Sequence, residues 1–285
     1  MSQKTKAPKL ERKLRKKRVK ITTVFSIIIL SFAMLAALFP GLLATHDPYY
    51  MDLIHKFQTP NPAHLLGTDE LGRDLYSRII YGARVSMFVG LGSATLAMLI
   101  GVPLGLVAGF KGGLLDSVIM RLMDAFMSFP SIMLAMLLMT IFDASTLTLM
   151  LTIAIVSFPA YGRIVRGSVL SVKERDYIEA ARAFGAKPGY LMFRAILPNC
   201  ASGIIVQFSL FTASAILIEA SLSFLGLGIK APDPAWGSML SYAKQYIDQS
   251  ATYILVPAIT IFLVVLSINL LGDELRERLD PTRQK

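Results

Sequence analysis

Residues 171–198 have the sequence SVKERDYIEAARAFGAKPGYLMFRAILP, and a long apolar segment lies on either side of them. Ser171 and Glu174 have the S-x-x-E spacing of a capping box, which predicts that a helix begins there. Its apolar residues recur at helical spacing and are Tyr177, Ile178, Ala181 and Phe184. Gly185 suits the left-handed residue that ends a helix, and Pro188 suits the first turn of another. The pattern predicts a helix–turn–helix whose apolar face packs on its own bundle or on another protein.

The flanking apolar segments belong to a set of six. A helix needs about 20 apolar residues to cross a hydrocarbon core about 30 Å thick. With 54% hydrophobic residues, 17% charged residues and a mean hydropathy of +0.57, the chain is neither a disordered segment nor an ordinary soluble enzyme. We expect a hairpin at Asp143 and Ala144, since one helix through both neighbouring segments would be too long for a membrane. The sequence therefore predicts an all-α membrane protein with six transmembrane helices, at 21–43, 85–110, 122–142, 145–162, 199–228 and 251–271.

The basic residues predict how these helices are oriented. Residues 1–20 hold ten Lys or Arg and one acid, Glu11, but no aromatic residue to stack on a nucleic acid base. With the N-terminus inside, the inner segments hold 23 of the 29 Lys and Arg residues and the outer segments hold six. Cytoplasmic loops of membrane proteins are enriched in these residues, so both termini are expected in the cytoplasm. The resulting division is a basic cytoplasmic tail (1–20), a first transmembrane helix that acts as an anchor (21–43), an outer loop (44–84), a five-helix core (85–271) that includes the cytoplasmic loop 163–198, and a cytoplasmic tail (272–285).

Small and polar residues inside the predicted helices indicate how they pack. Gly101, Gly105 and Gly109 share one face, which favours close packing within the chain over contact with a partner. A polar stripe in the fifth helix is expected to face the bundle or a wet cavity, where it lines a transport path or supports helix contacts. Glu219 is a functional candidate, unless it is hydrogen-bonded or hydrated near the outer interface. The stripe consists of Gly203, Gln207, Ser214 and Ser221.

The outer loop contains two pairs of opposite charge spaced four residues apart, Asp69 with Arg73 and Asp74 with Arg78. They predict an amphipathic helix at the outer surface, ahead of the second transmembrane helix. The histidines His46, His55 and His64 lie in the same loop, but their spacing does not place them on one helix face and no cysteine accompanies them. We therefore expect no metal site.

The sequence also argues against several classes of function. No Gly-Lys dipeptide occurs, so the chain has no Walker A loop with which to bind ATP. No predicted helix contains a histidine, as an intramembrane serine protease would need. Neither a ring of charges nor an inverted repeat indicates a channel or a secondary transporter. We expect a protein that is not an enzyme and binds no cofactor itself.

A resemblance to a known family rests on Glu179-Ala180-Ala181, Gly185 and Leu197-Pro198. Their spacing is similar to the EAA loop in membrane subunits of binding-protein-dependent ABC importers, although Ala195 stands where isoleucine is usual. Residues 66–78, 223–237 and 269–281 resemble the dipeptide, oligopeptide and nickel permeases, and their C-type subunit in particular. The resemblance implies the type I ABC importer permease fold and a multi-pass protein of the bacterial cytoplasmic (inner) membrane.

The resemblance also implies partners and cargo. They are a second, homologous permease subunit, two ATPase subunits that use ATP and Mg, and an extracytoplasmic substrate-binding protein. Peptides are the expected cargo, with nickel or a metal chelate as the alternative. The implied ATPase contacts are Glu179, Ala180, Ala181, Gly185, Leu197 and Pro198. The candidates for the translocation path are Gln207, Ser214, Ser221 and Glu219. The candidates for an outer gate or a contact with the binding protein are Asp69, Arg73, Asp74, Arg78 and Trp236, unless they only lead the chain into the membrane and anchor it.

Overall fold

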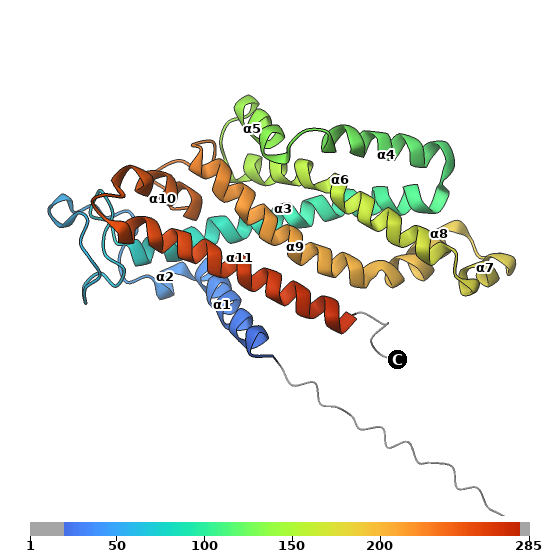
Figure 1. The fold of residues 1–285 in the computed structure, drawn as a ribbon, viewed down its shortest axis with the longest axis horizontal. Helices are drawn as coiled ribbons and strands as arrows, with labels where there is room; N and C mark the ends of the chain where they lie inside the picture. The colour runs from blue at the N-terminus through green and yellow to red at the C-terminus, as the bar shows by residue number, and fades with distance from the viewer. Residues whose placement is uncertain (1–19, 280–285) are drawn as a thin grey trace, which may run out of the picture.

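The computed structural model describes residues 20–279, which form an elongated bundle of helices (Figure 1). Most of the two predicted tails, residues 1–19 and 280–285, lies outside the described range. Short 3₁₀ turns cover Leu53–His55 and Lys244–Tyr246, and a π-helix covers Leu191–Ile196. The α-helices are α1 (Ile21–Leu38), α2 (Pro40–Leu43), α3 (Leu75–Lys111), α4 (Gly113–Met127), α5 (Ser131–Ile141), α6 (Thr146–Lys173), α7 (Asp176–Ala183), α8 (Pro188–Tyr190), α9 (Leu197–Phe224), α10 (Trp236–Ala243) and α11 (Ala251–Leu279).

Five helices of the described chain are long and apolar enough to cross a membrane: α1, α3, α6, α11 and the continuous helix Pro188–Phe224 that contains α9. The expected third span, 122–142, is not one straight helix. It is divided between α4 and α5, which meet at an angle of 84°. The break lies at Pro130, whose extended backbone and missing N–H cannot continue a helix. The hairpin expected at Asp143 and Ala144 is present, between α5 and α6.

The longest packing interface joins α3 to α6 and depends on glycine. A Cβ atom added to Gly101 would lie 2.5 Å from the Phe158 carbonyl oxygen, and one added to Gly105 would lie 2.3 Å from the Gly162 carbonyl oxygen. Both positions allow the two backbones to approach more closely than any side chain would permit. The prediction that this glycine face packs within the chain is confirmed.

The structure corrects two predicted helix starts. Residues 69–74 form a turn and not the start of an amphipathic helix, since Asp74 is the N-cap of α3 and accepts a hydrogen bond from the Ser77 backbone N–H at 2.8 Å. The helix predicted to begin at the capping box begins later, at Asp176, because α6 runs through Ser171 to its last residue, Lys173. Packing of the inner half of α6 into a buried apolar cluster extends that helix beyond its predicted end.

The two ends of the bundle carry different structures (Figure 1). The outer loop and α10 lie at one end, while α7, α8 and the turn between α3 and α4 lie at the other. The first described residue, Lys20, pairs through its Nζ with Glu277 of α11 at 2.7 Å and with Glu274 at 3.4 Å. The start of α1 and the end of α11 therefore lie together, as expected if both termini are on the same side of a membrane.

Candidate functional site

The short helix α7, which follows α6, is attached to the bundle by its one buried side chain, Ile178. Ile178 is fully buried in an apolar cluster with Val169 of α6, Leu106 of α3, and Met192 and Ile196 of the π-helix. Burial of an isoleucine side chain contributes about 1.5–3 kcal/mol relative to exposure. This contact fixes α7 across the end of the bundle (Figure 1).

The end of α7 has the conformation that the sequence predicts. Gly185 has a φ of +80°, and its N–H donates to the Arg182 carbonyl oxygen at 3.0 Å. The Ala186 N–H donates to the Ala181 carbonyl oxygen, also at 3.0 Å, which completes a Schellman motif. Pro188 then opens the continuous helix that runs through the π-helix into α9. The turn is therefore rigidly defined by its own backbone hydrogen bonds.

The predicted apolar face of α7 is divided between the inside and the outside. Ile178 points inward, but Phe184 is 92% exposed and Tyr177 is 44% exposed. Glu179 and Ala180 are also exposed, and the Glu179 carboxylate makes no hydrogen bond or ion pair with any residue in the range 20–279. These four exposed residues, Tyr177, Glu179, Ala180 and Phe184, form what we call the α7 surface. Its two aromatic rings, Tyr177 and Phe184, are of the residue type that is enriched at protein interfaces.

The polar stripe of α9 lies on a more open part of the molecule. Gln207 and Gly203 line a groove of about 320 Å³ together with Arg276 of α11 and Ile164 of α6. Further along α9, the Ser214 side chain is exposed. The stripe is therefore accessible from outside the chain, and the idea that it lines a path stays a prediction.

Glu219 does not share this exposure, because it lies buried between α9, α3 and α10. Its two carboxyl oxygens accept hydrogen bonds from the Ser86 hydroxyl at 3.0 Å and the Ser223 hydroxyl at 2.8 Å. The Ser86 oxygen also accepts a longer bond, at 3.4 Å, from the Trp236 backbone N–H. The alternative of a hydrogen-bonded carboxyl group is present in the structure, and a place for Glu219 on the translocation path stays a prediction. Sequence spacing does not show the hydrogen bond from Ser86, because Ser86 is 133 residues away.

The outer charged residues are also buried, which differs from the predicted surface helix. The Arg73 Nε lies 2.6 Å from Asp69 Oδ2, and the Arg78 Nε lies 3.5 Å from the same oxygen. The Arg78 Nη1 donates to the Pro48 carbonyl oxygen at 2.9 Å, and the Trp236 indole N–H donates to the Ile79 carbonyl oxygen at 3.0 Å. These side chains hold the outer loop and α10 onto α3. Their role in an outer gate or in a contact with a binding protein stays a prediction.

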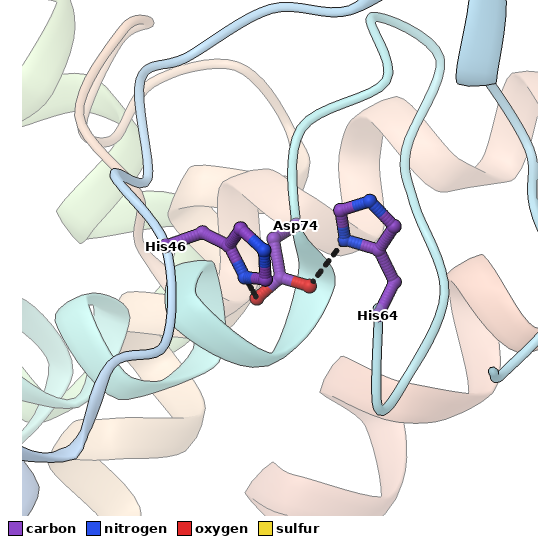
Figure 2. Close-up of side chains that lie close together, drawn as sticks. All are labelled: His46, His64 and Asp74. Carbon is purple, nitrogen blue, oxygen red and sulfur yellow. Dashed lines mark hydrogen bonds and ion pairs between the residues drawn. The ribbon is translucent and has the colours of Figure 1, made fainter. Parts of the chain in front are cut away.

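The three histidines are divided between two places in the outer loop. His55 hydrogen-bonds through Nδ1 to the Asp52 carboxylate at 2.8 Å, and this bond lowers the pKa of that carboxyl below its ordinary value. His46 and His64 instead come together beside Asp74, which the spacing of nine residues does not predict (Figure 2).

The family comparison covers most of the chain. Residues 101–285 match the model of a family described as binding-protein-dependent transport system inner membrane component. The chain is 44% identical to the dipeptide transport system permease protein DppC of Alkalihalophilus pseudofirmus, over 93% of this chain and 87% of that protein. It is 44% identical to the glutathione transport system permease protein GsiD of Pectobacterium atrosepticum, over 81% and 77%, and 36% identical to the oligopeptide transport system permease protein OppC of Bacillus subtilis, over 91% and 85%.

A solved structure shows that the fold is also shared. The chain superposes on a chain of the MetNI methionine ABC transporter in an inward-facing conformation, with a TM-score of 0.61. The match covers 71% of this chain and 96% of that one at 19% identity. The predicted importer permease fold is therefore confirmed.

Proposed function

Because the chain belongs to the family of binding-protein-dependent transport system inner membrane components, we propose that it is the permease subunit of an ATP-driven importer of di- or oligopeptides. Its relatives at 36–44% identity include permeases named for dipeptide, di/tripeptide, glutathione and oligopeptide transport. Each of these cargoes is a short chain with peptide bonds, which favours peptides over the alternative of nickel or a metal chelate. The protein is a transport subunit and not an enzyme.

The proposed link to ATP is the α7 surface. A small helix at the end of the bundle, anchored by Ile178 and ended by the Gly185 turn, presents Glu179 and Phe184 outward. We place this end of the bundle in the cytoplasm. We propose that the α7 surface binds an ATPase subunit that uses ATP and Mg. The exposed carboxylate offers a charge-assisted hydrogen bond, and the phenylalanine ring offers an apolar knob for a socket on that partner. Leu197 and Pro198 are the first residues of α9 and continue the helix that begins at Pro188, so movement of α7 would move α9.

The remaining partners complete the proposed transporter. A second permease subunit would cover the accessible face of α9 on which Gln207 and Ser214 lie, and the path would run between the two subunits. A substrate-binding protein would deliver peptide at the opposite end, beside the outer loop and α10. The whole assembly would lie in the bacterial cytoplasmic membrane with both termini of this chain inside. The single observation that carries the proposal is the anchored but outwardly exposed α7 surface.

The test is purification of the chain from its native host by an affinity tag, followed by mass spectrometry. Wild-type protein is expected to bring down two ATPase subunits, a second permease and a binding protein that holds a peptide. Phe184→Ser removes the most exposed aromatic ring of the α7 surface and is expected to reduce ATPase recovery at least tenfold. The matched control is Ile54→Ser, since Ile54 is 89% exposed at the opposite end of the bundle.

Ile54→Ser should leave ATPase recovery unchanged. Equal ATPase recovery with wild-type protein, Phe184→Ser and Ile54→Ser would contradict the role of the α7 surface. Recovery of a binding protein that carries nickel or a metal chelate, with no peptide, would overturn the proposed cargo.

A further inference from the structure

Three segments of the outer region place potential metal ligands in one cluster (Figure 2). His46 lies just after α2, His64 lies in the loop that follows the Leu53–His55 turn, and Asp74 caps α3. Each residue offers one ligand atom, and these atoms all lie within 4.8 Å of one another. The His64 Nδ1 is 3.0 Å from Asp74 Oδ1, and the His46 Nδ1 is 3.7 Å from Asp74 Oδ2.

The carboxylate is held in place by its neighbours. Asp74 Oδ2 accepts hydrogen bonds from the backbone N–H and the hydroxyl of Ser77, at 2.8 Å and 2.7 Å. The same hydroxyl oxygen accepts the backbone N–H of His46 at 2.9 Å, so Ser77 fixes two of the three residues. Asp74 Oδ1 faces His64 and makes no other contact among the hydrogen bonds of the described residues. Such outer partners orient the ligands of metal sites.

The charge around the cluster is not neutralised by a basic side chain. Within the range 20–279, Arg73 and Arg78 pair with Asp69, whereas the ion-pair partners of Asp74 are the two histidines alone. The Asp74 side chain is 1% exposed, while those of His64 and His46 are 19% and 39% exposed. A buried carboxylate therefore faces two imidazoles that solvent, and a dissolved ion, can reach.

We propose that His46, His64 and Asp74 bind a divalent transition-metal ion of the Zn²⁺ class, which joins the outer loop to the start of α3. Two imidazole nitrogens and one carboxylate oxygen suit Zn²⁺, whereas Mg²⁺ and Ca²⁺ prefer oxygen ligands throughout. A water molecule completes four-coordination on the exposed side. The inference does not depend on the cargo of the transporter.

The ligands need only a small rearrangement to reach coordination geometry. Two ligands of a tetrahedral zinc ion lie about 3.3 Å apart, as bond lengths of about 2.0–2.1 Å require. The pair formed by His64 and Asp74 is already at 3.0 Å. The His46 side chain is the most exposed of the three. To coordinate the ion it rotates toward Asp74, and the 3.0 Å hydrogen bond between its Nδ1 and the Thr45 hydroxyl breaks. The backbone of His46 stays fixed by Ser77 during this rotation.

The test uses the intact protein in detergent, with an affinity tag that contains no histidine, after removal of bound metal by a chelator. Zn²⁺ is titrated by calorimetry into wild-type protein and into the variants His46→Gln, His64→Gln and His55→Gln. His55 is the matched control, since it lies in the same loop but pairs with Asp52. We expect one equivalent of Zn²⁺ to bind to wild-type protein and to His55→Gln, and at least tenfold weaker binding to the other two variants.

Thermal unfolding separates metal binding from folding. Without metal, His46→Gln is expected to unfold at the wild-type temperature because the side chain is 39% exposed. Added Zn²⁺ should raise the unfolding temperature of wild-type protein and of His55→Gln, but not that of His46→Gln. When Co²⁺ replaces Zn²⁺, the visible absorption of a four-coordinate site should appear only in wild-type protein and in His55→Gln. Equal Zn²⁺ affinity in all four proteins, or no binding to wild-type protein at micromolar concentration, would overturn the proposal.

Discussion

At the scale of single residues, Glu219 determines how the outer ends of α3, α9 and α10 meet. Glu219→Ala would leave the hydroxyls of Ser86 and Ser223 without their acceptor and open a cavity, so we expect a loss of roughly 2–4 kcal/mol in stability. Glu219→Gln keeps the shape and a hydrogen-bonding group and should lose less than half of that. Thermal unfolding in detergent measures the difference, with the exposed Ser214→Ala on the same helix as the control. Equal unfolding temperatures for Glu219→Ala and wild-type protein would exclude this role.

Single residues also show where sequence reasoning succeeds. The left-handed conformation of Gly185 was predictable, because a glycine after a short helix has a local conformational reason to be there. The inward position of Ile178 and the outward position of Phe184 were not, since helical periodicity defines a face without saying which part of it the bundle covers. The pairing of His46 with His64 depends on how a long irregular loop folds, for which the sequence has no periodic signal.

At the scale of secondary-structure elements, α3 and α6 pack at a separation that depends on glycine. Gly105→Ala would place a Cβ 2.3 Å from the Gly162 carbonyl oxygen, so the helices must separate along their length. We expect a loss of about 1–3 kcal/mol, as for other overpacked sites, and a lower yield of folded protein. Gly167→Ala is the matched control on α6, since a Cβ there meets nothing within 4 Å. Thermal unfolding of both variants checks the prediction, and a stable Gly105→Ala protein would contradict it.

The helices themselves were largely predictable, because apolar length alone identifies a membrane-crossing segment. The errors arose where a local or tertiary feature overrides length. Pro130 breaks the third span into α4 and α5, and α4 also pairs with α6, since Asp116 binds the guanidinium of Arg166 through both oxygens at 2.6 Å. At the start of α3, the Asp69–Arg73 pair forms as the spacing suggests, but it closes a buried turn and not a helix.

At the scale of the whole molecule, the two ends of the bundle differ in structure. α7 lies at one end, and the outer loop and α10 lie at the other (Figure 1). The outer loop carries the buried ion pairs and the histidine cluster. The continuous helix from Pro188 to Phe224 connects the two ends, since it begins beside α7 and ends at the network around Glu219. If an ATPase displaces α7, the displacement would therefore reach the outer end through one continuous helix, without an intermediate loop.

The separation of the two ends predicts opposite accessibility across the membrane. Phe184 and Ile54 are 92% and 89% exposed, so Phe184→Cys and Ile54→Cys should both place a reactive thiol on the surface. The single native cysteine, Cys200, is buried, and replacing it with serine removes any background. In intact spheroplasts, a membrane-impermeant maleimide should label only Ile54→Cys, and in inside-out vesicles only Phe184→Cys, because the excess of basic residues predicts that the α7 end lies inside. Both thiols should react after detergent is added, which controls for reactivity. Labelling of Phe184→Cys in intact spheroplasts would place the α7 surface outside the cell, where no ATPase could reach it.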